Sequence, residues 1–240
     1  MEETLLLFSW GSKGWGDELV LGALVTAEVA LVAFAGGLLL GLIGAIGKLS
    51  GRLSYALAHG YSVVFRGLPE LLVISLIYFG GSLAIRALLA PFGFRGYIEF
   101  NPFVSGTLAL ALVMGAYATE LFRGAILSVD EGQVQAASAL GLHRWHAFFL
   151  VILPQAFRIA LPGLSNLWMT ILKNTALLSV IGLVDMVRAA QLGAASTRMP
   201  FPFFTAVAVG YIVLTYLSQI AIRRIEFRTN RGMSDSSVMV

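Results

Sequence analysis

The chain has 240 residues, of which 58% are hydrophobic and 12% charged, with a formal net charge of +3 and a mean hydropathy of +0.85. Soluble domains carry about 25% charged residues, so these values exclude an ordinary soluble protein and indicate an integral membrane protein. The sequence has no cysteine and three histidines, which excludes disulfides and thiolate catalysis, and no metal site is predicted.

The first predicted membrane helix covers residues 19–47, where Glu28 is the single charge. About 20 apolar residues cross a bilayer, so this run is long enough. Gly37 and Gly41 stand four residues apart in it, a spacing that lets another helix approach closely. A second helix is predicted from about residue 68 to residue 90.

Three further helices complete the predicted membrane domain. One begins after Pro102 and is uncharged from residue 103 to residue 119. The next runs from residue 159 to about residue 184 and contains Lys173, and the last covers the charge-free run 199–222. The prediction is therefore an all-α integral membrane protein with five transmembrane helices, whose termini lie on opposite sides.

The placement of lysine and arginine predicts the orientation, because these residues are retained on the cytoplasmic side. One side holds Lys48, Arg52, Arg66, Arg123, Arg144, Arg158, Arg223, Arg224, Arg228 and Arg231, and the other holds Lys13, Arg86, Arg95, Arg188 and Arg198. The more basic side is predicted to be the cytoplasm, which places the N-terminus outside and the C-terminus inside.

The connecting segments are interpreted by composition. Residues 47–67 place apolar and basic side chains at helical spacing, which predicts an amphipathic helix in the cytoplasmic interface or a plain linker helix. The aromatic residues of 91–101 are typical of an interfacial belt, with a docking surface for an outside partner as the alternative. The polar, serine-rich tail 229–240 is expected to be disordered.

These assignments divide the chain into three parts. Residues 1–18 have acids where a cleavable signal has a basic stretch, so we expect this segment to be retained. The predicted parts are an outer N-terminal segment over 1–18, a membrane domain over 19–225 that includes a cytoplasmic loop over 129–154, and a cytoplasmic tail over 226–240.

The loop 129–154 is predicted to form two short helices. Asp130 can cap a helix that starts near residue 131, and Gly141 ends the run of helix formers. A second, aromatic helix is expected over 143–152, after which Pro154 is expected to redirect the chain into the next membrane helix. From its residues alone, the loop is either an interfacial hairpin or a helix whose small side chains fit a groove of another protein.

The string QAASALGLHRWHAFFLVILPQAFR in this loop resembles the EAA loop of bacterial ABC importer permeases. The matching positions are Gln135, Ala136, Ala137, Gly141, Leu153 and Pro154. RGLPELL at 66–72, AYATELFRGAI at 116–126 and LPGLSNLWMTILKNTALLSVIGL at 161–183 are similar, in the same order, to the polar amino acid subfamily. The likeness is greatest to the first membrane subunit of histidine, lysine-arginine-ornithine and octopine or nopaline uptake systems.

One residue departs from the family pattern. Gln135 stands where the pattern has glutamate, which removes a charge and any salt bridge expected there, although an amide still donates and accepts hydrogen bonds.

The resemblance implies the five-helix, MetI-like permease fold of type I ABC importers, located in the bacterial inner membrane. It implies a permease subunit that takes up a polar, basic amino acid or a derivative such as an opine. The short loop helix would be the coupling helix, which sits in a groove of a cytoplasmic ATPase. The implied partners are a second homologous permease in a heterodimer, with a homodimer as the alternative, two copies of the ABC ATPase, a periplasmic solute-binding protein and membrane lipid, but no nucleic acid.

The chain is expected to bind no cofactor and to be no enzyme. The stretch most similar to a phosphate loop is 41–50. It has Leu42 where the motif needs glycine and Leu49 where the motif needs serine or threonine. ATP and Mg²⁺ would therefore belong to the partner ATPase.

Two other classes of protein are kept as alternatives. An ion-coupled secondary transporter would explain acids inside the membrane, but such proteins commonly have repeated halves, and no internal repeat is visible here. A channel subunit for small polar solutes would explain the helices. Neither class explains the loop.

Charges inside a membrane are costly, which makes each of them a candidate functional residue. We interpret Glu120 as paired with Arg123 or with a neighbouring loop, and Glu70 as a helix-terminal or loop contact. The roles of Glu28 and Lys173 stay open between structure and transport. The substrate path is predicted between the last three helices of two permeases, and its candidate residues are Glu120, Asn166, Lys173, Asn174, Thr175 and Asp185.

Overall fold

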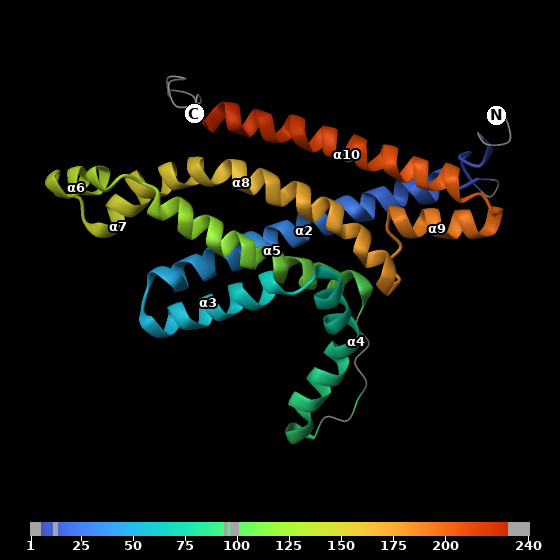
Figure 1. The fold of residues 1–240 in the computed structure, drawn as a ribbon, viewed down its shortest axis with the longest axis horizontal. Helices are drawn as coiled ribbons and strands as arrows, with labels where there is room; N and C mark the ends of the chain where they lie inside the picture. The colour runs from blue at the N-terminus through green and yellow to red at the C-terminus, as the bar shows by residue number, and fades with distance from the viewer. Residues whose placement is uncertain (1–5, 12–13, 94–95, 97–100, 230–240) are drawn as a thin grey trace.

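The structure is a computed structural model that describes residues 6–11, 14–93, 96 and 101–229 (Figure 1). Its principal helices are α2 (Gly16–Leu49), α3 (Arg52–Gly67), α4 (Glu70–Leu89), α5 (Pro102–Leu127), α6 (Glu131–Ala139), α7 (Arg144–Ala147), α8 (Leu153–Asn174), α9 (Met186–Thr197) and α10 (Pro200–Thr229). Shorter turns are η1 (Ala90–Phe92), η2 (Phe148–Ile152) and η3 (Thr175–Ile181).

Five helical runs in the described residues are long and apolar enough to cross a membrane, which confirms the five predicted spans. They are Gly16–Leu49, Glu70–Phe92, Pro102–Leu127, Arg144–Ile181 and Pro200–Thr229. Of the predicted features, most of the aromatic cluster in 91–101 and nearly all of the C-terminal tail lie outside the described residues.

The centre of the fold is α5, which packs along α2 and α8. The predicted close approach at the paired glycines is confirmed, and α5 is the partner. A Cβ added at Gly41 would lie 3.0 Å from the backbone carbonyl carbon of Ala118, and one added at Gly37 would meet Met114. Small residues on both helices therefore bring the two backbones together, as tight packing in a membrane requires.

The helix predicted for 47–67 is confirmed as α3. It packs along α2 and α5 (Figure 1). The hydroxyl of Tyr61 donates to the carbonyl oxygen of Leu112 at 2.6 Å, and Ser62 is fully buried. The helix differs from the expected surface segment because these polar groups join one of its faces to the bundle.

Two of the five spans are poorly covered within the chain. α4 leaves the bundle at a steep angle after the break at Pro69 (Figure 1), with Val73 and Ile74 as its buried residues. α10 lies along the outside of α8, and only Phe203 and Val207 are buried in it. The apolar faces of both helices are left for the membrane or for another protein.

The structure contains one helix that the sequence interpretation missed. α9 lies between the fourth and fifth spans and packs on α2 and α10. The available signal was Asp185 followed by a run of helix formers, a pattern typical of an N-terminal cap. Arg198, with φ of 58°, ends the helix.

Candidate functional site

The loop helix α6 begins and ends where the sequence predicts. The Asp130 side chain accepts a hydrogen bond from the backbone N–H of Gly132 at 2.7 Å. At the other end Gly141 has φ of +77°, its N–H donates to Ser138, and the N–H of Leu142 donates to Ala137. This pair of bonds is the Schellman arrangement, which requires a left-handed residue and favours glycine there.

The two alanines of the matched motif face different ways. Ala137 is 3% exposed and is the buried residue of α6, whereas Gln135 and Ala136 are exposed. The expectation of one small face formed by both alanines is therefore wrong, because Ala137 packs inside its own chain. Residues spaced four apart share a helix face, so Gln135 lies with Glu131 and Ala139 on the side opposite Ala137.

The loop is joined to α8 by a continuous helical run. Pro154 stands in the first turn of α8 after the wide turn η2. The prediction that it redirects the chain sharply is therefore wrong. Proline lacks an N–H and its ring collides with the preceding turn, and η2 accommodates this with a bond from the N–H of Leu153 to the oxygen of Phe148. The Gln155 side chain donates to the oxygen of Val151 at 3.0 Å. Movement of α7 can thus be passed to α8 without a hinge, and the turn at Gly141 connects α6 to α7.

A buried ionic cluster joins α2, α3 and α5. The ammonium of Lys48 donates to the carboxylate of Glu120 and, at 2.7 Å, to the hydroxyl of Ser62. Ser62 donates to Glu120 at 3.0 Å, and Arg66 lies 3.5 Å from the same carboxylate oxygen. Of the two predicted contacts of Glu120, the pair with Arg123 is wrong, whereas the contact with a neighbouring connecting segment is confirmed by Ser62 and Arg66. Because two cations already hold Glu120, it is also a poor candidate for binding substrate.

Arg123 takes no part in this cluster. Its Nε atom is buried and has no hydrogen-bond partner among the described residues. The nearest cations to Glu120 come from helices that are distant in sequence, which a search for residues three or four positions apart does not find.

A polar stripe runs along the exposed side of α8. Asn166, Thr170 and Lys173 are exposed and follow one another at spacings of four and three residues, which places them on one face. Lys173 lines an open groove of about 470 Å³ with Tyr211 and Gln219 of α10. No hydrogen bond or ion pair joins Lys173 to another described residue, so its charge is left for a group outside this chain.

Asn174 and Thr175 lie where α8 gives way to η3 and have different surroundings. Thr175 is fully buried, donates to the oxygen of Leu172 at 2.7 Å and lies 3.3 Å from the hydroxyl of Tyr211. Its role is structural. Asn174 lines a cavity of about 20 Å³ together with Thr170 and Glu70. Glu70 begins α4, as expected of a helix-terminal acid, and the fold brings it beside the α8 stripe.

Asp185 is the N-cap of α9 and is fully buried. Its Oδ1 atom accepts from the N–H of Arg188 at 2.8 Å, while Oδ2 has no partner among the described residues. Burial raises the pKa of this carboxyl to about 6, because the charged form is poorly solvated. The next backbone N–H, that of Met186, donates to Thr26 at 3.3 Å. Asp185 is thus a capping residue that a substrate does not reach in this conformation.

Glu28 lies on the exposed side of α2. Neither Glu28 nor any other acid, histidine or cysteine belongs to a group of three such residues that could hold a metal ion in the described part of the chain.

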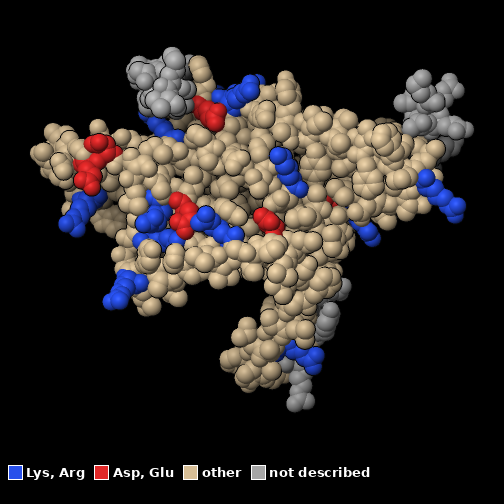
Figure 2. Space-filling view, in the orientation of Figure 1, with Lys and Arg blue, Asp and Glu red and all other residues tan. Residues whose placement is uncertain are grey.

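Basic side chains gather at one end of the molecule. Figure 2 shows more lysine and arginine over the end that carries α6 and the C-terminal end of α10 than over the end that carries α9. This is the end predicted to face the cytoplasm, and the orientation itself stays a prediction.

Comparisons with known proteins agree with this architecture. Residues 37–231 match the family described as binding-protein-dependent transport system inner membrane component. The nopaline transport system permease protein NocQ of Agrobacterium fabrum is 43% identical over 231 residues, which cover 95% of this chain and 98% of that protein. The histidine/lysine/arginine/ornithine transport system permease protein HisQ of Escherichia coli is 40% identical over 221 residues, covering 92% and 96%.

Solved structures give the same result. A chain in the crystal structure of an amino acid ABC transporter with histidines has a TM-score of 0.77 and 32% identity, covering 89% of this chain and 95% of that chain. The MetNI methionine ABC transporter, in an inward facing conformation, has a TM-score of 0.70 at 19% identity, covering 89% and 97%. The second match shows a shared fold.

Proposed function

The chain belongs to the family of binding-protein-dependent transport system inner membrane components, and we propose that it forms half of a pathway for a basic amino acid or an opine. It is a permease subunit of an ABC importer in the inner membrane. The names of the relatives, which transport nopaline or histidine, lysine, arginine and ornithine, support this substrate class. We assign ATP hydrolysis to a separate cytoplasmic ATPase, and substrate delivery to a solute-binding protein.

The observation that carries the proposal is the geometry of α6. All residues of α6 except Ala137 are exposed, and the helix lies at the end of the molecule (Figure 1). It packs against α7 and η2, which continue as one helical run into α8. A groove of the ATPase would close on the face formed by Glu131, Gln135 and Ala139. The resulting movement of α6 would then tilt α8, which carries the polar stripe.

Two variants that replace exposed alanines of α6 by arginine test this contact. Ala139→Arg and Ala136→Arg place a long cation on exposed positions of α6, so the permease should fold while the ATPase no longer co-purifies with it and uptake is lost. Ala56→Arg on the exposed side of α3 is the matched control and should retain the ATPase. Normal ATPase binding by both α6 variants would contradict the assignment. Ala137→Arg is unsuitable, because it would disrupt the loop itself.

We propose that a second, homologous permease covers the exposed face of α4 and the face of α10 that borders the groove of Lys173. Within the most apolar window, 6% of α10 and 11% of α4 are buried inside the chain, and Lys173 has no partner there. The likeness to the first subunit of two-permease systems favours a different chain and therefore a heterodimer with two ATPase copies. Native mass spectrometry of the intact complex measures this directly, and a single copy of this permease with active transport would contradict it.

The substrate path is proposed along the α8 stripe, with Glu70 as its acid. An ammonium group needs a carboxylate when it leaves water, and Glu70 is the acid that lines a cavity with Thr170 and Asn174. Glu120 and Asp185 are engaged elsewhere. Glu70→Gln should lower uptake of arginine about tenfold or more, since a hydrogen bond to a charged group contributes about 1.5–3 kcal/mol.

Asp185→Asn is the matched control for this variant. Asparagine caps a helix as well as aspartate does, so uptake should be retained. Loss of uptake in Asp185→Asn, with normal uptake in Glu70→Gln, would move the acid of the path to Asp185.

A further inference from the structure

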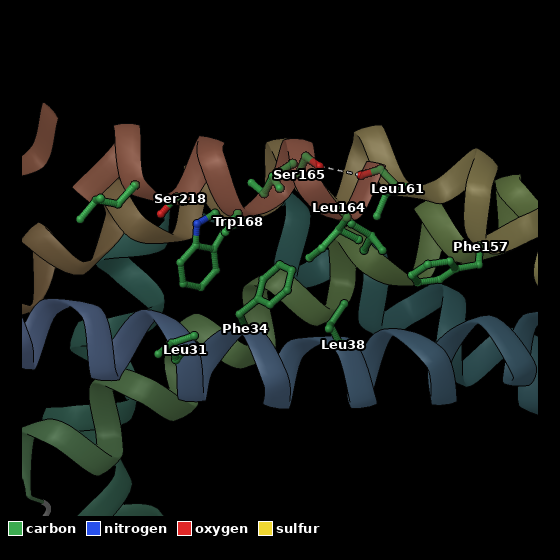
Figure 3. A pocket seen from close by; sticks show the side chains of 13 residues that line it. Leu31, Phe34, Leu38, Phe157, Leu161, Leu164, Ser165, Trp168 and Ser218 are labelled. Atoms are coloured by element: carbon green, nitrogen blue, oxygen red, sulfur yellow. Dashed lines mark hydrogen bonds between the residues drawn. The ribbon is translucent and has the colours of Figure 1, made fainter. Parts of the chain in front are cut away.

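An apolar cleft of about 500 Å³ lies between α2, α8 and α10 (Figure 3). Phe34 and Trp168 meet edge to face within it, with ring centroids 5.3 Å apart. Ser165 is one of its two serines. Its hydroxyl donates to the oxygen of Leu161 at 2.9 Å and lies 3.3 Å from a carboxylate oxygen of Glu226. Leu38 and Leu164 complete the wall shown in Figure 3.

The shape of the cleft selects its occupant. The α8 residues that line it extend from Phe157 to Trp168, a length of about 16 Å at the rise of an α-helix. The cleft has a volume of about 500 Å³ along this length. An extended hydrocarbon chain fits a space of this length and apolar lining.

The lining also excludes the transported amino acid. An ammonium or carboxylate in this cleft would find aromatic and aliphatic side chains and would lose its hydration without gaining a partner. The polar stripe of α8, by contrast, faces the groove of Lys173 and does not line this cleft. The occupant is therefore apolar along most of its length.

Cations lie at one end of the cleft. Arg158 precedes Ser165 by seven residues, and Arg224 follows Leu217 by seven residues. Two helical turns separate each pair, so each arginine continues a face that lines the cleft. Both arginines are exposed, and both lie toward the end of the molecule that carries α6. Basic side chains between membrane helices at the cytoplasmic side attract anionic head groups, by about 1 kcal/mol each.

We propose that this cleft is a binding site for an anionic phospholipid. One acyl chain fills the space between Phe34, Trp168 and Leu217, and the phosphate pairs with Arg158 and Arg224. The lipid would hold α10 against α2 and α8, because these two helices make few direct contacts with α10.

The test uses the complete importer in vesicles that contain phosphatidylglycerol with a photoactivatable group on its acyl chain. After illumination, peptide mass spectrometry should find adducts on peptides that line the cleft, around Trp168 and Leu217. Ala221→Phe places a ring in the cleft and should lower this labelling at least severalfold. Ala208→Phe is the matched control, since Ala208 is an exposed alanine of the same helix and should leave the labelling unchanged.

A second arm tests the head group. Phosphatidylcholine with the same photoactivatable chain should label the cleft less than phosphatidylglycerol, and the double variant Arg158→Gln/Arg224→Gln should remove the difference. Arg52→Gln, an exposed arginine on α3, should preserve it. The proposal is overturned if cleft peptides are labelled no more than the exposed side of α2 around Leu39, if Ala221→Phe changes nothing, or if adducts are absent because a partner helix covers the cleft. Equal labelling by the two lipids in the unaltered importer would overturn the anionic specificity.

Discussion

Two spanning helices of similar length and apolar character, α5 and α10, have opposite positions in this fold. Within their most apolar windows, 67% of α5 and 6% of α10 are buried inside the chain. The buried face of α5 is made largely of glycine, alanine, serine and threonine, whereas α10 presents leucine, isoleucine, valine and aromatic side chains outward. Apolarity therefore identifies a membrane helix, while the size of its side chains indicates whether another helix of the same chain packs against it.

The largest expected effect comes from breaking the contact that buries α5. Gly41→Leu would drive a branched side chain into the Ala118 backbone, which cannot move as a flexible side chain can. We expect an overpacking cost of at least about 3 kcal/mol, with little folded permease recovered. The measurement is the yield of monodisperse protein and its unfolding midpoint in detergent.

Gly124→Leu on α5 is the control for this variant. A Cβ at Gly124 has nothing within 4 Å, so the protein should fold as well as the unaltered chain. Equal stability of the two variants would contradict the close approach of α2 and α5 at Gly41.

The next effect concerns the ionic cluster that joins α5 to α2 and α3. Glu120→Gln leaves the buried ammonium of Lys48 without its carboxylate, and breaking such a pair costs about 3–5 kcal/mol. Because Glu120 is 29% exposed, we expect about 3 kcal/mol or less. The double variant Lys48→Met/Glu120→Gln should recover much of the loss in a double-mutant cycle of unfolding free energies. Additive losses would contradict a direct pair.

A smaller effect is expected at Asp185, which starts the helix that packs on α10. Its pKa is raised from 3.8 to about 6, so the folded state holds the proton more tightly than the unfolded state does. The contribution to stability is therefore present at about pH 4 and is lost as the pH rises through 6. Asp185→Asn keeps the cap without this loss and should be more stable than the unaltered chain at pH 7, by about 2–3 kcal/mol.

Comparison of unfolding at pH 4 and pH 7 checks this prediction. Asp185→Ala, which removes the cap, should be about 1 kcal/mol less stable than Asp185→Asn at both values. A pH dependence that is the same in the unaltered chain and in Asp185→Asn would assign the titration to another group.

The smallest effect is expected on the outer side of α10. Ala208→Leu adds a side chain to an exposed position and should change the unfolding free energy of the isolated permease by no more than about 0.5 kcal/mol. A cost similar to that of Gly41→Leu would mean that α10 is packed within its own chain, and the contrast with α5 would fail.

Much of the loop 129–154 could be predicted from its residues, because caps and glycine turns act locally. Asp130 and Gly141 set the bounds of α6 through bonds that span a few residues. Which alanine faces outward could not be predicted, since it depends on how α6 packs against η2. Ala137 was for this reason assigned to the partner surface although it is buried in its own chain.

The sequence by itself determined that the protein lies in a membrane, that it has five spans, and which family it belongs to, because apolar length and local motifs depend on neighbouring residues. The start of the fourth span was not predicted, since it begins at Arg144 and not near residue 159. The tertiary structure decided which charges meet. Lys48 and Glu120 are 72 positions apart, and the placement of α4 makes Glu70 line a small cavity with Asn174. Such contacts follow from the packing of whole helices, whose energy is spread over many small residues. That packing also leaves Lys173 and the cleft beside Trp168 open to partners outside the chain.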